Sequence, residues 1–468
     1  MEASKPGATV IPLVVSTNHT QITQFRGKMV YPFYLTLGNI PKDIRWKPSC
    51  HAQIPLAYLP TTYLRHVAND ASQHRMIHNL FHSCLSQILA PLWRVGVEGI
   101  LMKDGGGVLQ HCHPILACYI GDYPEQVLVT GTKMMDCPKC NIPANQLGSL
   151  MEPYELWDHQ EILNVLALVD LDPQSFWETC KKLHIKPIFQ PFFVHLPYMD
   201  IFQAIMPDIL HQLHQGVLKH LLSWLVQAYR VSEINTHTQC LIPNHHIQIF
   251  SSSITNLSWV TGKVCDLISQ IILSIIIGAR IVNDLEPSRM VQTVRAFLDF
   301  LYLAHLPLQM TKMLSLLHRA LQTFHENMSI FVDLGIWWNF NIPKIHACWH
   351  YESSIRLFGS TDNYDTQYTE RLHKDFSKKP SQATNMRDEL LQMAVWVEQQ
   401  EQVHQHTRYV HWLKQGGIQA ATTWSPIPNL KPYHCIKMLK EPSVYSVSIK
   451  KLETDYSASR FKRYLHSL

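Results

Sequence analysis

Asp122 is the first residue whose type and position could do chemistry. It follows an apolar run, Pro114–Ile120, from which only Gly121 separates it. A carboxylate at the end of a buried strand can reach a divalent ion in an open cleft, and hard ions such as Mg²⁺ take oxygen ligands. The same carboxylate could instead cap the turn that begins at Tyr123. The position alone leaves both interpretations open.

A second set of residues has the types that bind zinc. Cys137 and Cys140 have the Cys-x2-Cys spacing of half a tetrahedral zinc site. Asp208, His211 and His214 follow one another at three-residue intervals, so a helix would place them on one face. A lone Cys-x2-Cys pair is weak evidence for a metal. The alternative is two structural cysteines and a set of histidines on a helix surface.

Glu370 is a third candidate. It follows a turn-rich entry that begins at Thr361, on a helix predicted over residues 364–379, and it shares one helix face with His373. A single glutamate on a helix is usually solvated. Spacing alone therefore assigns Glu370 no role.

Composition restricts the class of protein. The chain has 468 residues, of which 46% are hydrophobic, with 40 Lys+Arg against 36 Asp+Glu. These values indicate a globular chain of two or three domains, or of one domain with a large insertion, and exclude a disordered or fibrous chain. The run Gly105–Gly107 lacks the following Lys-Ser/Thr of a phosphate loop, so we expect no nucleotide cofactor.

The location of the protein follows from what the sequence lacks. The longest uncharged apolar run, residues 267–279, is shorter than the roughly 20 residues that a membrane span needs. The first residues contain no apolar segment typical of a secretory signal. An odd number of cysteines, 11, argues against a secreted disulfide framework. We therefore expect a nuclear or cytoplasmic protein with no membrane partner.

The elements that position the candidates follow an α/β order. Short apolar runs predict strands over 8–15, 30–37, 52–59 and 114–120. An apolar stripe from Ile77 to Leu92 predicts a helix between the third and fourth strands, ending at Pro91 and Gly96. Residues 141–340 are predicted to be mainly helical. Polar residues end the first and last strands, where α/β sheets gather their ligands.

The end of the chain differs in charge. Residues 431–468 hold eight Lys or Arg and three Asp or Glu. Such a basic segment can dock on a phosphate backbone or simply be solvated.

In combination these features resemble a known family, the Plavaka transposases. These are fungal members of the CACTA (En/Spm-like) superfamily of cut-and-paste DNA transposases. The similarity runs in order from about residue 10 to about residue 463. The segments that carry it are Gln21–Lys28, Tyr34–Arg45, Gly121–Gln126 with Cys137–Cys140, Met206–Gly216, Asn341–His346 and Thr361–His373.

The resemblance implies an α/β fold with an RNase H-like core, a mixed sheet and a large helical insertion. It implies an N-terminal part of the core at 8–126, the insertion at 127–340, a C-terminal helical part of the core at 341–410 and a basic tail at 411–468. Such cores carry a DDE triad that holds two Mg²⁺ (or Mn²⁺) ions for DNA strand cleavage and transfer.

The family's residues can be carried over position by position. The second carboxylate falls on Asp122 and the third on Glu370. The first falls in Thr17-Asn18-His19-Thr20, where the family has a Ser-Asp-Lys-Thr-like stretch, so Asn18 replaces an Asp. An amide oxygen is neutral and binds Mg²⁺ much more weakly than a carboxylate. We therefore expect a catalytically inactive or impaired enzyme.

The resemblance also bears on zinc. The family's paired Cys-x2-Cys and Asp-x2-His elements fall on Cys137, Cys140, Asp208 and His211, which implies a zinc or structural cluster within the insertion. His214 is an additional candidate ligand on the same helix face.

The expected partner is DNA, at the terminal repeats of the element, and such enzymes usually act as multimers, so a homo-oligomer is expected. The family usually has a longer N-terminal region with a zinc-finger-like module, and we therefore expect a degenerate or truncated copy. The alternative is a domesticated module that binds DNA or protein without catalysis, or a non-functional remnant.

Overall fold

The computed structural model describes residues 7–23, 27–104, 107–149, 154–242, 254–255, 261–281 and 287–414. The chain divides into two compact units, Met1–Gln399 and Gln400–Leu468. The described part of the second unit is the end of one long helix. The basic segment 431–468 lies outside the described residues, and the domain boundaries expected from the sequence stay a prediction.

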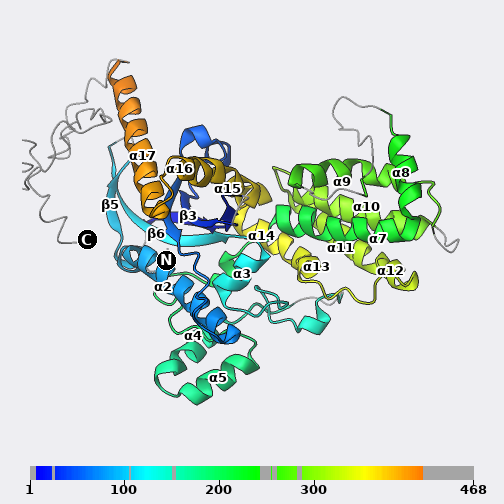
Figure 1. Cartoon of the computed structure of the whole chain (residues 1–468), viewed down its shortest axis with the longest axis horizontal. Coiled ribbons are helices and arrows are strands. Elements are labelled where there is room, and N and C mark those ends of the chain that lie inside the picture. The colour runs from blue at the N-terminus through cyan, green and yellow to red at the C-terminus, as the bar shows by residue number, and fades with distance from the viewer. Residues whose placement is uncertain are drawn as a thin grey trace, which may run out of the picture. The chain divides into compact units, whose positions relative to one another are not determined.

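The first unit contains a mixed six-stranded sheet, which confirms the α/β class (Figure 1). The strand order is β2-β3-β1-β6-β5, and β4 pairs with β3. The strands are β1 (Thr9–Thr17), β2 (Thr20–Gln21), β3 (Met29–Leu37), β4 (Gln53–Leu59), β5 (Ile100–Lys103) and β6 (Leu109–Ile120).

The pairing of β1 with β6 fixes the edge of the sheet where the first candidate residues lie. This pair is parallel, whereas the other strand pairs within the described residues are antiparallel. Ser16 is opposite Ile120. Asn18 and Asp122 each follow two residues later, so both leave the sheet at the same edge and at the same level.

Helices cover both faces of the sheet (Figure 1). Neighbouring residues of a strand point to opposite faces. Phe33 of β3 belongs to a buried cluster with Leu85 of α2 (Asp70–Glu98). The next residue, Tyr34, clusters with Leu372 of α15 (Thr366–His373). Helices α2 and α15 therefore pack on opposite faces, and α15 is the helix that carries Glu370.

Helix α2 is longer than the sequence predicts. It continues through Pro91 to Glu98, although an internal proline removes a hydrogen bond and costs about 3 kcal/mol. Phe81, Leu85 and Leu89 of this helix are buried. Burying such side chains contributes about 1.5–3 kcal/mol each, which outweighs the proline.

Most of the remaining helices form a bundle around a second core (Figure 1). Its centre includes Trp224, Phe297 and Tyr351, all buried. The helices associated with this core are η4 (Ile209–Leu218), α7 (Lys219–Tyr229), α8 (Val231–Gln239), α9 (Gly262–Ile276), α10 (Pro287–Ala304), α11 (Thr311–Asn327), α12 (Ile330–Asp333), α13 (Pro343–His346), η6 (Ala347–His350) and α14 (Tyr351–Phe358).

The other helical segments connect these parts. They are α1 (Lys42–Arg45), η1 (Pro48–Cys50), α3 (Tyr123–Thr130), η2 (Ala144–Gln146), α4 (His159–Leu166), η3 (Ala167–Asp170), α5 (Pro173–Lys182), α6 (Ile201–Ala204), η7 (Thr361–Asn363), η8 (Lys374–Lys378), α16 (Lys379–Gln382) and α17 (Glu389–Lys414). Among the described helices, none has the length and apolar character that crossing a membrane requires.

A buried acid ties the strand ends together. Glu125, in the first turn of α3, accepts hydrogen bonds from the hydroxyls of Thr17 and Tyr31. Tyr119 is 2.6 Å from the Thr17 hydroxyl. A Cβ at Gly121 would lie 2.7 Å from the Glu125 Cγ, so the acid fits there only beside a glycine. Burial raises the pKa of Glu125 to about 7, although the hydrogen bonds from Thr17 and Tyr31 oppose the shift.

We predict that Glu125→Gln changes the pH dependence of folding. The folded-state pKa, about 7, lies above the ordinary value of 4.5, so the folded chain binds this proton more tightly than the unfolded chain. The associated stability is complete below pH 4.5 and is lost as the pH rises through 7, an effect of about 3 kcal/mol.

Urea denaturation between pH 4 and 8 measures this effect. The free energy of unfolding of the wild type should fall relative to that of Glu125→Gln over this range. The control is Glu326→Gln, a change of an exposed glutamate on α11. Parallel profiles for the wild type and Glu125→Gln would contradict the prediction.

Candidate functional site

Asp122 caps helix α3, and the charges of Asp208, His211 and Lys344 act on its carboxylate. Its Oδ1 accepts a hydrogen bond from the amide of Glu125 at 3.0 Å, so the capping interpretation describes a contact that is present. The cap uses one carboxylate oxygen and leaves the other for a further ligand. Burial raises the pKa of Asp122, and the positive charges of His211 and Lys344 oppose this shift.

Asp208 is buried and fully engaged by hydrogen bonds. It precedes η4, and its side chain accepts from the amides of Leu210 and His211. It also accepts from the Thr366 hydroxyl at 2.6 Å. Because these donors occupy both of its oxygens, Asp208 acts as a positioning group for its neighbours.

His211 joins Asp208 to Glu370. Its Nδ1 lies 2.6 Å from Oδ2 of Asp208, and its Nε2 lies 3.0 Å from Oε1 of Glu370. Burial disfavours the charged ring, but the two carboxylates outweigh it and raise the pKa of His211 to about 10. The ring is therefore an imidazolium at neutral pH, held between two acids.

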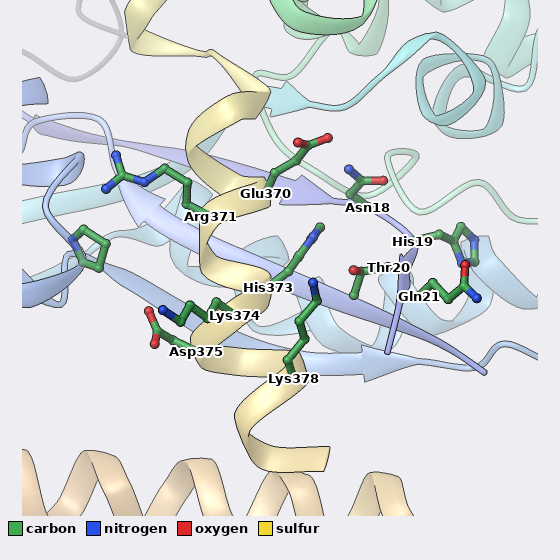
Figure 2. A pocket seen from close by; sticks show the side chains of 11 residues that line it. Asn18, His19, Thr20, Gln21, Glu370, Arg371, His373, Lys374, Asp375 and Lys378 are labelled. Carbon is green, nitrogen blue, oxygen red and sulfur yellow. The ribbon is translucent and has the colours of Figure 1, made fainter. Parts of the chain in front are cut away.

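Glu370 and Asn18 line the same cavity, which has a volume of about 680 Å³. Figure 2 shows the Glu370 carboxylate and the Asn18 amide turned toward the same side of the helix. Glu370 comes from α15 and Asn18 from the end of β1. His211 connects the two acids, because it pairs with Glu370 and its positive charge also acts on Asp122.

The structure thus brings together three expected positions, Asn18, Asp122 and Glu370, at one edge of the sheet. Two of the three carry carboxylates. Within the described residues, the acids at this edge do not form a group of three or more ligands close enough to hold a metal ion. Asn18 contributes a neutral amide to this edge, in place of a charged group.

A second centre contains Cys137, Cys140, His346 and His350. Their ligand atoms all lie within 4.8 Å of one another, and all four residues are buried. The Cys140 Sγ is 3.1 Å from the His346 Nε2, and the Cys137 Sγ is 3.3 Å from the His350 Nε2. Two thiols and two imidazoles form a donor set that could hold a metal ion. Of the described residues, these four alone form such a group.

The electrostatics of this centre favour a thiolate. Burial opposes the charged form of Cys137, but hydrogen bonding by Cys140 and the nearby His350 lower its pKa well below the usual range. A thiolate is the form of cysteine that binds metals. Lys139, buried between the cysteines, donates to the carbonyls of Gln203 and Ile205.

The grouping expected from the sequence needs correction. Asp208 and His211 lie beside Glu370 rather than with the cysteines, and His214 contacts His305, with 3.0 Å between their Nε2 atoms. The π-helical turns of η4 bury His214 among the bundle helices, whereas His211 faces the sheet edge. The candidate ligands that sequence reasoning missed are His346 and His350, whose four-residue spacing is itself typical of zinc ligands.

One known protein family matches part of the chain. The family model of the Plavaka transposase matches residues 1–225. This segment includes Asn18, Asp122, both cysteines and His211, whereas Glu370 and the two histidines of the metal centre lie beyond it. No curated protein matches the chain.

We predict opposite pH effects from two histidines of η4. The pKa of His211 is raised to about 10, so its contribution to stability is complete below pH 6.5 and lost as the pH rises through 10. Burial lowers the pKa of His214 to about 4, so its contribution is present above pH 6.5 and lost as the pH falls through 4.

Chemical denaturation in EDTA tests both statements. The cost of His211→Gln should be largest at pH 6 and shrink toward pH 10. The matched control, His214→Gln, should show no such decrease at alkaline pH. A cost of His211→Gln that stays constant from pH 6 to 10 would show that the ring is not held as an imidazolium.

Proposed function

We propose that this chain is a transposase-derived protein of the DDE cut-and-paste type, with an RNase H-like core and an impaired catalytic centre. The Plavaka match over residues 1–225 supports the transposase origin. The order of β1, β3, β4, α2 and β6, with β1 parallel to β6, supports the RNase H-like core.

The observation that carries the proposal is the arrangement at the sheet edge. Asn18 and Asp122 follow adjacent parallel strands at the same level, and Glu370 reaches this edge from a helix on one face. Three positions from three distant segments of the chain converge as the acidic residues of a DDE triad would. One of them is an amide.

The chemistry follows from what these residues can hold. Asp122 and Glu370 are the residues that would hold Mg²⁺ or Mn²⁺, which would activate a water or a DNA 3′-hydroxyl and stabilise the leaving oxygen. Asn18 offers a neutral oxygen in place of a charged one. His211 pairs its positive charge with the Glu370 carboxylate, and this pairing further weakens the attraction of this edge for a cation. Both features support an impaired enzyme.

These same two features favour a second candidate function, a module that binds DNA without cleaving it. A neutral Asn18 and a neutralised Glu370 reduce the negative charge that would repel a phosphate. DNA is the partner in both cases. A nuclear location and a homo-oligomer remain predictions from the resemblance.

We also propose that the centre of Cys137, Cys140, His346 and His350 holds zinc. The donor set and the buried position are those of a closed structural site. The centre joins the segment after α3 to the segment at α13 and η6, which are more than 200 residues apart in the chain. Zinc there would fix the bundle to the sheet-bearing part of the first unit.

We predict that Asn18→Asp restores metal-dependent DNA cleavage. The substitution supplies the missing carboxylate beside Asp122 and Glu370. With Mg²⁺ or Mn²⁺ and a plasmid that carries the DNA flanking the gene, cleavage should rise at least about a hundredfold over the wild type, or about 2.7 kcal/mol in the barrier.

Two controls accompany this assay. Asn39→Asp adds the same charge at an exposed position and should leave cleavage unchanged. The double variant Asn18→Asp/Asp122→Asn should lose the restored activity. Robust cleavage by the wild type would refute the impairment, and an inactive, folded Asn18→Asp variant would refute the DDE assignment.

We predict one zinc ion per chain, bound at the Cys2His2 centre. Elemental analysis of purified protein should find it, and Cys140→Ser should lose it, whereas Cys240→Ser, at an exposed cysteine, should keep it. At free zinc of a thousand times the Kd, the ion should add about 4 kcal/mol to the free energy of unfolding relative to chelated protein. If protein that is produced with excess zinc contains no bound metal, the site is ruled out.

A further inference from the structure

Three cationic side chains help to line the cavity beside Asn18 and Glu370. Arg371, Lys374 and Lys378 line it, and all three are exposed. None of them forms a salt bridge with another described residue. Figure 2 shows Lys378 rising from below toward the Asn18–Gln21 segment, with Arg371 and Lys374 on the other side of the helix.

The two acids of the cavity already have partners. Glu370 pairs with His211 at 3.0 Å, and Asp375 pairs with Lys379 at 2.6 Å. Of the remaining lining residues, His19 and His373 carry imidazole rings. Among the described residues no carboxylate pairs with Arg371, Lys374 or Lys378, so the cavity is suited to an anion.

The helix geometry places the cations beside the candidate site. Helix α15 passes without a break into the π-helical segment η8, Lys374–Lys378. In a straight α-helix, a residue eight positions after Glu370 would be rotated by about 80° from it. The wider π turns reduce this rotation and return Lys378 toward the face of Glu370. Single π turns inside helices are frequent at functional sites.

The opposite wall of the cavity offers an aromatic surface. The His19 ring stacks on Tyr31, with 3.7 Å between the ring centroids and 22° between the planes. His19 is exposed, so the stacking fixes one face of the ring and leaves the other toward solvent. Aromatic rings held in this way form platforms on which nucleic-acid bases stack.

We propose that this cavity binds a single strand of DNA, with Arg371, Lys374 and Lys378 contacting its phosphates and His19 stacking against a base. The inference rests on the proposed function, since it identifies the strand path that leads to Asn18, Asp122 and Glu370. A volume of about 680 Å³ is within the range of small-ligand sites and fits a few nucleotides of one strand rather than a duplex.

The test is a binding measurement in EDTA, which removes any contribution from metal-dependent cleavage. A fluorescent oligothymidylate is titrated with the full chain at several salt concentrations. The double variant Lys374→Gln/Lys378→Gln should weaken binding and reduce the slope of log K against log salt by about 1.4, since each lost phosphate contact removes about 0.7 for a single strand.

Two controls separate a nucleic-acid path from a general anion site. Lys182→Gln/Lys312→Gln removes two exposed lysines elsewhere and should leave the slope unchanged. His19→Ala should weaken binding of the oligothymidylate more than binding of an abasic oligomer of the same length. A slope that both lysine pairs change equally would overturn the proposal, as would a His19→Ala effect that is the same for both oligomers.

The outcome is distinguishable from that of the proposed function. If Asn18→Asp cleaves DNA but the lysine pair of η8 does not affect binding, the strand path is wrong and the DDE assignment stands. If the lysine and His19 variants behave as expected but Asn18→Asp is inactive, the strand path stands and the DDE assignment is wrong. Circular dichroism of each variant confirms that it is folded.

Discussion

The parallel pairing of β1 with β6 is the constraint on which the candidate site depends. These strands are about a hundred residues apart in the chain, and the register that places Ser16 opposite Ile120 also brings the two strand ends level. Glu125 of α3 supports this register, because its carboxylate accepts hydrogen bonds from the hydroxyls of Thr17 on β1 and Tyr31 on β3. A shift by one residue would turn Asn18 and Asp122 to different faces.

The sheet edge combines negative and positive groups in a balance that differs from that of a metal-binding enzyme. The oxygens of Asp208 are occupied by hydrogen bonds, and the positively charged His211 pairs with Glu370. Asn18 is neutral. Asp122 is therefore the acid of this edge that forms no salt bridge with a described residue. The nearby cations of η8 then dominate the adjacent cavity. This charge distribution suits a phosphate backbone better than a pair of divalent ions.

Local signals in the sequence predicted the α/β class, the helix between the third and fourth strands, and polar residues at the ends of the first and last strands. The grouping of Asn18, Asp122 and Glu370 followed from the family resemblance, because spacing alone gave Glu370 no role. Ser16 and Thr17 show where such signals fail. Their polarity suggested that the first strand ends near residue 15, but β1 continues to Thr17 because Tyr119 and Glu125 satisfy its buried hydroxyl. The partners of Cys137 and Cys140 could not be predicted from neighbouring residues, since His346 and His350 come from a distant helix.

Manganese binding tests the central claim most directly, namely that Asn18 occupies the position of a missing metal ligand. Electron paramagnetic resonance of Mn²⁺ titrated into the zinc-loaded chain reports binding without requiring cleavage or knowledge of the DNA sequence. Asn18→Asp should bind Mn²⁺ at least about tenfold more tightly than the wild type, or about 1.4 kcal/mol, and Asp122→Asn should abolish this gain. Equal Mn²⁺ affinity in the wild type and Asn18→Asp would contradict the claim.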